Sequence, residues 1–191
     1  MRIEIMDTTL RDGEQMQGIS YSPVEKLHIA ALLLKEVKVD RIEVASARVS
    51  SGEIEALKMV TRWARRNNFQ KKVEVLGFID GDISINWIHD AGGKVVNLLC
   101  KGSLRHLEKQ LRKTPEQHVN DIKGIIKRAG ELGMDVNIYL EDWSNGMISS
   151  EDYVYYMIDN LKDEKIMRFM LPDTLGILNP DQTYSFCKKM Q

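Results

Sequence analysis

The feature that most constrains the fold is a regular alternation of short apolar runs with longer amphipathic segments along the whole chain. Each apolar run is five or six residues long and rich in Val, Ile and Leu, which is typical of strands buried on both faces of a sheet. The six predicted strands are Arg2–Asp7, Asp40–Ala45, Val73–Phe78, Val95–Cys100, Asp135–Leu140 and Ile166–Leu171.

The segments between these strands have helical periodicity and recognisable start signals. The helix predicted at Pro23–Val37 follows Ser22, a favourable N-cap, and begins with proline, which suits the first helical position. The helix predicted at Pro115–Leu132 follows Thr114 in the same way. The full set of predicted helices is Pro23–Val37, Gly52–Asn68, Ser84–Ala91, Ser103–Leu111, Pro115–Leu132, Ser150–Leu161 and Pro180–Met190.

A strand-helix repeat of this kind predicts an α/β fold, with a parallel sheet covered by helices. Two architectures are compatible with it, an open doubly wound sheet and a (β/α) barrel. No glycine-rich phosphate-binding loop follows any predicted strand, which disfavours the nucleotide-binding form of the open sheet. A closed eightfold barrel typically needs ~250 residues, so the 191 residues here are too few to close one.

Composition and charge exclude several functional classes. The 27 Lys and Arg residues nearly balance 28 Asp and Glu residues, so the chain has no field that would attract nucleic acid or a membrane surface. No apolar run approaches the ~20 residues needed to span a bilayer, and the amino terminus lacks the apolar stretch of a secretory signal. We therefore expect a cytoplasmic protein that binds neither nucleic acid nor membranes.

Acidic residues gather at the carboxyl ends of the predicted strands, where parallel sheets place their catalytic groups. Converging carboxylates are costly unless a cation or an arginine neutralises them. Oxygen-rich sites suit Mg²⁺ or Mn²⁺, or Zn²⁺ when imidazole is added. Alternatively, each acid only caps the helix that follows it. The four histidines fall inside predicted helices, away from this edge: His28, His89, His106 and His118.

Three motifs at strand ends carry a resemblance to a known family. They are Asp-Thr-Thr-Leu-Arg-Asp-Gly-Glu-Gln at 7–15, Tyr-Leu-Glu-Asp-Trp-Ser-Asn-Gly at 139–146 and Leu-Pro-Asp-Thr-Leu-Gly at 171–176. They resemble signatures of the family that contains 2-isopropylmalate, homocitrate and citramalate synthases and hydroxymethylglutaryl-CoA lyase. The resemblance implies an incomplete TIM (β/α)8 barrel with about six β/α units. It also implies an acyltransferase that condenses acetyl-CoA with a 2-oxo acid in leucine or isoleucine biosynthesis.

The resemblance implies a role for each motif residue. Asp12 would be a ligand of a divalent metal (Mg, Mn or Zn), and Arg11 would stabilise the negative oxygen that develops on the oxo acid or the enolate. Glu141 would position or activate the acetyl group as part of the general-base system. Thr174 would hydrogen-bond the substrate carboxylate, and Glu43 would support Arg11.

The choice of oxo acid depends on three further positions. Leu76, Leu99 and Tyr139 match residues that make the pocket of the citramalate branch small, which favours pyruvate over larger oxo acids. Each methylene excluded is worth only ~1–3 kcal/mol, so 2-isopropylmalate synthase stays a close alternative. A hydroxyacyl-CoA lyase of the same superfamily and a non-catalytic short family member also stay open.

The resemblance also places a His-x-His metal pair on the next strand, after Gln191. We therefore expect residues 1–191 to form the amino-terminal part of the catalytic barrel domain and to be inactive alone. The whole protein is expected to be a homodimer. Replacing Arg11 by alanine in it should abolish activity with little loss of stability.

Overall fold

The computed structural model describes residues 3–191, and in that range six parallel strands form one sheet in sequential order. This confirms the predicted α/β fold with six β/α units. Arg2, which was predicted to begin the first strand, lies outside the described residues. The strands are β1 (Met6–Asp7), β2 (Arg41–Ser46), β3 (Val73–Phe78), β4 (Val95–Lys101), β5 (Asp135–Glu141) and β6 (Arg168–Met170).

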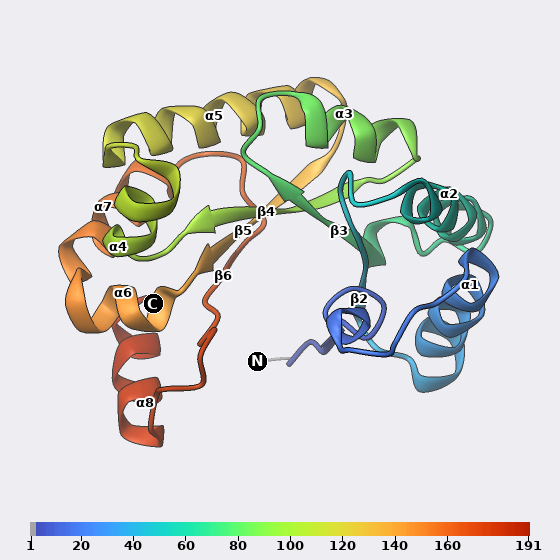
Figure 1. Ribbon diagram of the computed structural model, residues 1–191, viewed down its shortest axis with the longest axis horizontal. Helices are drawn as coiled ribbons and strands as arrows, with labels where there is room; N and C mark the ends of the chain where they lie inside the picture. Colours follow the sequence, from blue (N-terminus) through green and yellow to red (C-terminus); the bar gives the residue numbers. More distant parts are fainter. Residues whose placement is uncertain (1–2) are drawn as a thin grey trace.

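The longer helices lie on one side of this curved sheet. Figure 1 shows them in an arc over the strands, while the opposite side stays open. They are α1 (Pro23–Leu32), α2 (Ser51–Arg66), α3 (Ile83–Asp90), α5 (Pro115–Glu131) and α7 (Glu151–Leu161). Because a doubly wound sheet would reverse its strand order and carry helices on both faces, the architecture is that of a barrel. Within residues 3–191, β1 and β6 do not pair, so the barrel is partial.

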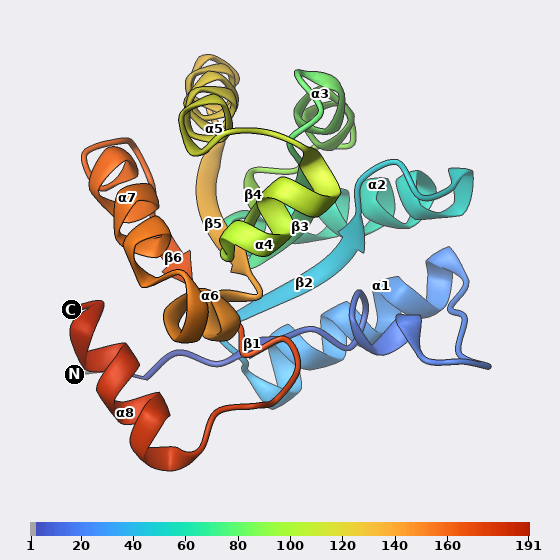
Figure 2. The same ribbon diagram turned by 60° about the vertical axis from the view of Figure 1, so that its left-hand side comes forward.

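Local sequence explains where the helices begin. Ser22 and Thr114 are N-caps, as the sequence predicted. Each accepts a hydrogen bond from the backbone N–H of the third helical residue, whose side chain accepts the N-cap N–H in return, which makes a capping box. Asn179 does the same for α8 (Pro180–Lys189), which lies on the open side of the molecule (Figure 2). No helix among residues 3–191 has the length and apolarity needed to cross a bilayer.

Two short helices differ from the prediction. The segment predicted as one helix at Ser103–Leu111 is α4 (Leu104–His106) followed by a π-helical turn. A further helix, α6 (Trp143–Ser149), was not predicted, because its Ser-Asn-Gly sequence has poor helix propensity. Tertiary packing overrides that propensity: the Trp143 ring is fully buried and lies edge-on to Phe186, with 6.3 Å between ring centroids.

The sheet buries apolar side chains against the helices, but its inner face carries polar ones. Glu43, Glu74, Asn97 and Asn137 are all fully buried. At the amino-terminal end of the sheet, Arg168 of β6 donates to Glu4, just before β1, at 2.9 Å. This ion pair links the two outer strands of the partial barrel at that end.

Candidate functional site

The carboxyl ends of the strands surround a cavity of about 590 Å³. Except for Glu43, every predicted site residue lines it: Arg11, Asp12, Leu76, Leu99, Tyr139, Glu141 and Thr174. The remaining lining residues are Thr8, Gln15, Ser46, Val49, Phe78, Pro172 and Asp173. Glu43 lies behind the cavity surface, fully buried. The fold therefore brings together lining residues that are up to 166 positions apart in the sequence, Thr8 and Thr174.

The loop after β1 presents Arg11 and Asp12 through a tight backbone turn. The carbonyl of Thr8 accepts three backbone N–H groups, from Arg11 at 3.0 Å, Asp12 at 2.8 Å and Gly13 at 3.1 Å. The carboxylate of Asp7 accepts the N–H of Thr9 at 2.9 Å, which fixes the start of the turn. The first motif thus encodes a loop geometry as well as two chemical groups.

A buried lysine anchors the same loop to the helices, which sequence reasoning missed. The Lys26 side chain of α1 is 1% exposed, and its Nζ lies 2.5 Å from Glu14 Oε2 and also pairs with Glu53 of α2. It donates a further hydrogen bond to the carbonyl of Leu10 at 3.1 Å. A buried ammonium needs partners of this kind to offset its desolvation. Glu14 of the motif therefore stabilises the fold by pairing with Lys26.

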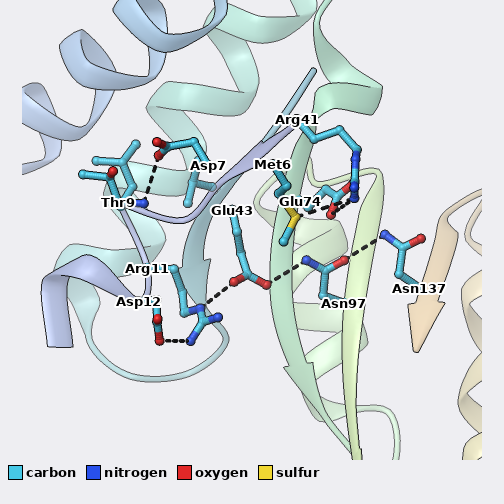
Figure 3. Close-up of polar contacts among 12 residues, drawn as sticks. Met6, Asp7, Thr9, Arg11, Asp12, Arg41, Glu43, Glu74, Asn97 and Asn137 are labelled. Atoms are coloured by element: carbon cyan, nitrogen blue, oxygen red, sulfur yellow. Dashed lines mark hydrogen bonds and ion pairs between the residues drawn. The ribbon is translucent and has the colours of Figure 1, made fainter. Parts of the chain in front are cut away.

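Behind the cavity, a chain of four side chains crosses the sheet from the β1 loop to β5 (Figure 3). Arg11 Nε donates to Glu43 Oε2 at 2.5 Å, and Asn97 Nδ2 donates to Glu43 Oε1 at 2.7 Å. Asn137 Nδ2 in turn donates to Asn97 Oδ1 at 2.8 Å. Asn137 Oδ1 has no hydrogen-bond partner among the described residues. Arg11 also donates to Asp12 Oδ1 at 2.8 Å, so two carboxylates fix its orientation.

The buried carboxylate and its neighbours perturb one another's ionisation. Burial raises the pKa of Glu43, opposed by the charge of Arg11 and the hydrogen bond from Asn97. Burial alone would lower the pKa of Arg11, but the charge of Glu43 and its hydrogen bond outweigh that, and the net pKa is raised. Burial, aided by the charge of Glu43, raises the pKa of Tyr139 to about 12. The cavity therefore contains a permanent guanidinium and a protonated phenol.

The far side of the cavity is formed by the ends of β4, β5 and β6. Glu141 makes an ion pair with Lys101, the last residue of β4, which the sequence alone did not assign to the site. Thr174 Oγ1 accepts the backbone N–H of Asp142 at 3.0 Å, which leaves its own O–H proton available to a ligand. The carboxylate of Asp173 already has partners in the protein, because it accepts the backbone N–H groups of Ile177 and Leu178 in the following loop.

The donor set around the cavity does not by itself fit a metal ion. Among residues 3–191, no group of three or more His, Cys, Asp or Glu side chains is arranged to hold one. Asp12 is 61% exposed and bonded to Arg11, and a stable site needs several such ligands. The predicted role of Asp12 as a metal ligand therefore stays a prediction.

None of the four histidines, all within residues 3–191, lines the cavity, which agrees with their expected placement, but His118 contacts the end of β4 from the helix side. This residue of α5 is fully buried, and its Nε2 accepts the backbone N–H of Lys101 at 3.1 Å. The hydroxyl of Tyr153 in α7 donates to the carbonyl of Lys101 at 2.8 Å. Both backbone groups at the end of β4 are therefore satisfied by side chains from the outer helices, and His118 must be neutral at Nε2 to accept.

We expect His118 to make the protein sensitive to mild acid. Burial lowers its pKa from the ordinary 6.5 to about 4, with a smaller contribution from the charge of Lys113. Between these two values the unfolded chain binds a proton that the folded chain excludes. His118 therefore does not reduce the free energy of unfolding above pH 6.5. As the pH falls from 6.5 to 4, that free energy decreases by about 3 kcal/mol.

Urea unfolding of the wild type and of His118→Gln at pH 7 and pH 4 tests this expectation. Glutamine can accept the Lys101 N–H but does not titrate, so the variant should lose about 3 kcal/mol less than the wild type over that range. His89→Gln is the control, because His89 is 39% exposed on α3. An equal loss in the wild type and in His118→Gln would contradict the assignment.

Similarity to known proteins extends along the whole chain. A family model described as HMGL-like matches residues 2–191. The (R)-citramalate synthase of Methanocaldococcus jannaschii is 32% identical over 190 residues, covering 100% of this chain and 37% of the relative. The 2-isopropylmalate synthase of Pyrococcus furiosus is 30% identical over 190 residues, with the same 100% and 37% coverage.

A solved structure has the same fold. The HMG-CoA lyase of Bacillus subtilis superposes with a TM-score of 0.78 over 99% of this chain and 64% of that chain, at 17% sequence identity. At that identity the likeness concerns the fold alone. The chain spans little more than a third of the length of the two synthases it matches.

Proposed function

Because the chain belongs to the HMGL-like family, we propose that it supplies one side of the active site of an acyltransferase that condenses acetyl-CoA with a small 2-oxo acid. The observation that carries this proposal is the single cavity lined by Arg11, Glu141 and Thr174 together with an apolar patch. The sequence relatives named as citramalate and 2-isopropylmalate synthases support the reaction class.

The oxo acid would be held by Arg11 and Thr174. Glu43 and Asp12 fix the guanidinium of Arg11, so its charge is directed before substrate arrives and no reorganisation is needed during the reaction. It would stabilise the negative charge that grows on the carbonyl oxygen when the new bond forms. The free O–H of Thr174 would donate to the substrate carboxylate.

Glu141 would act on the acetyl group. As part of the general-base system it would help to remove a proton from the acetyl methyl, giving the enolate of acetyl-CoA. The enolate carbon then attacks the carbonyl carbon of the oxo acid, and the former carbonyl oxygen takes up a proton to become a hydroxyl. Hydrolysis of the thioester releases CoA and makes the condensation irreversible.

The apolar part of the cavity sets the size of the oxo acid. Leu99 of β4 pairs in register with Tyr139 of β5, and Leu76 of β3, whose register partner is Asn97, lies diagonally across from Leu99. Tyr139 presents a bulky ring there. These three side chains restrict the space beyond the carbonyl group, which supports pyruvate as the preferred substrate.

We therefore expect pyruvate to be used with a kcat/KM at least about tenfold above that of 2-oxoisovalerate, which carries two more carbons. The assay measures CoA thiol release by the complete protein with acetyl-CoA, Mg²⁺ or Mn²⁺, and one oxo acid at a time. 2-Oxobutanoate, which has one extra carbon, should fall between them. Faster turnover of 2-oxoisovalerate would contradict the preference, and cleavage of hydroxymethylglutaryl-CoA without any condensation would favour a lyase.

A further inference from the structure

The ends of β4 and β5 carry an ion pair beside the cavity. Lys101 lies opposite Glu141 in the strand register, and its Nζ bonds Glu141 Oε2. Both side chains are largely covered, at 13% and 27% exposed. Glu141 lines the cavity, whereas Lys101 contacts Glu141 without being part of the lining.

The backbone around this pair is held rigidly. The N–H of Gly102 donates to the carbonyl of Glu141 at 2.7 Å, which ties the two strand ends together. Lys101 is held on both sides as well, since its N–H donates to His118 and its carbonyl accepts from Tyr153. An ion pair built on so fixed a frame can orient a carboxylate, whereas one between flexible surface side chains contributes little.

Lys101 is the counter-ion of Glu141, and the other acids near this pair have partners of their own. Of the other acids lining the cavity, Asp12 is paired with Arg11, and Asp173 accepts backbone N–H groups. The neighbouring Asp142 faces away from this pair.

Asp142 is buried among partners of its own. It accepts from Ser103 Oγ and Asn145 Nδ2, both at 2.7 Å, and lies 3.5 Å from His106 Nε2. Lys101 is therefore the cation that directly contacts Glu141 among the residues described.

We propose that Lys101 is a positioning residue, whose ammonium holds the carboxylate of Glu141 in one orientation at the cavity surface and balances its charge. The inference rests on the proposed function, in which Glu141 acts on the acetyl methyl. Without Lys101, the carboxylate loses the only cation that contacts it among the described residues and gains rotamer freedom. A displacement of about 1 Å from the reactive geometry costs roughly 100-fold in rate.

The test is steady-state kinetics of the complete protein carrying Lys101→Met, Lys101→Arg, Glu141→Gln or the double change Lys101→Met with Glu141→Gln. We expect Lys101→Met to lower kcat by about 10- to 100-fold while both KM values change less than about threefold. Lys101→Arg, which keeps the charge, should recover part of the loss. The double variant should be no slower than Glu141→Gln alone, because Lys101 acts through that carboxylate.

The matched control is Lys71→Met, which removes the ion pair with Asp135 at the other end of β5 and should leave kcat unchanged. Circular dichroism of each variant confirms that it is folded. Two outcomes would overturn the positioning role of Lys101 but leave the proposed role of Glu141 standing. One is a loss of kcat in the double variant equal to the product of the two single losses. The other is a normal kcat in Lys101→Met together with an impaired kcat in Glu141→Gln. A fully active Glu141→Gln enzyme would instead overturn the proposed role of Glu141, and the positioning role with it.

Discussion

Replacing Arg11 by alanine should lower kcat by at least about 100-fold, because the guanidinium is the cation fixed at the cavity where negative charge would develop. Its two hydrogen bonds, to Glu43 and Asp12, show that it is directed before substrate binds. Arg11→Lys keeps a charge but cannot reproduce both contacts of the planar guanidinium, so it should recover only part of the activity. Thiol release by the complete protein measures the effect.

The same substitution should also destabilise the protein, in contrast to what the sequence alone suggested. Glu43 is 0% exposed, and without Arg11 only the amide of Asn97 would remain to it. Breaking a buried ion pair from one side costs on the order of 3 kcal/mol. Because burial already raises the pKa of Glu43, protonation of the carboxyl would reduce that cost.

Arg41→Ala is the matched control that separates stability from chemistry. Arg41 is 13% exposed, like Arg11, and pairs with Glu74, which is as fully buried as Glu43. This second pair lies away from the cavity lining. Urea unfolding should show comparable losses for the two variants, while only Arg11→Ala loses activity beyond its folded fraction. Equal activity in both would contradict the assignment of Arg11.

Replacing Gly146 by alanine should severely disrupt folding. A Cβ at this position would lie 2.0 Å from the carbonyl oxygen of Gly102 and 2.9 Å from a methyl of Val154. Because the nearest atom belongs to the backbone, no side-chain rotation relieves the clash, and α6 must move away from the end of β4. We expect a loss on the order of 3 kcal/mol or more.

The control is Gly124→Ala, in the middle of α5, where an added Cβ has nothing within 4 Å. There alanine should stabilise the protein by about 0.5–1 kcal/mol, because it favours the helical backbone. Thermal unfolding of the two variants should therefore shift in opposite directions. A Gly146→Ala protein as stable as the wild type would show that the contact between α6 and the Gly102 backbone is not required.

Periodicity and capping residues were enough to predict most of the fold. The six strands follow from their Val- and Ile-rich runs, and the capping residues Ser22 and Thr114 predicted the starts of α1 and α5. The family motifs then indicated which strand-end residues would share a cavity, and all except Glu43 line it. The strands and helix starts are encoded locally, so a linear reading of the chain recovers them, whereas the shared cavity was expected from the family resemblance.

Contacts between distant segments could not be predicted in the same way. Nothing in the sequence pairs Lys101 with Glu141, or His118 with the backbone of Lys101, across 40 and 17 positions. The available signal was the presence of Glu43, Glu74, Asn97 and Asn137 within otherwise apolar strands, which indicates a polar inner layer but not its partners. Helix α6 depends on the burial of Trp143 and likewise has no local signal.

The sequence by itself determined the order of strands and helices, the starts of the capped helices and the chemical groups at the strand ends. The tertiary structure decided which of the other charges face one another: Lys101 with Glu141, and Lys26 with Glu14. The physical reason is that hydrophobic periodicity and capping act over a few residues of chain. A buried charge instead requires a partner close in space, and only the closed packing of the sheet and helices determines which residue that is.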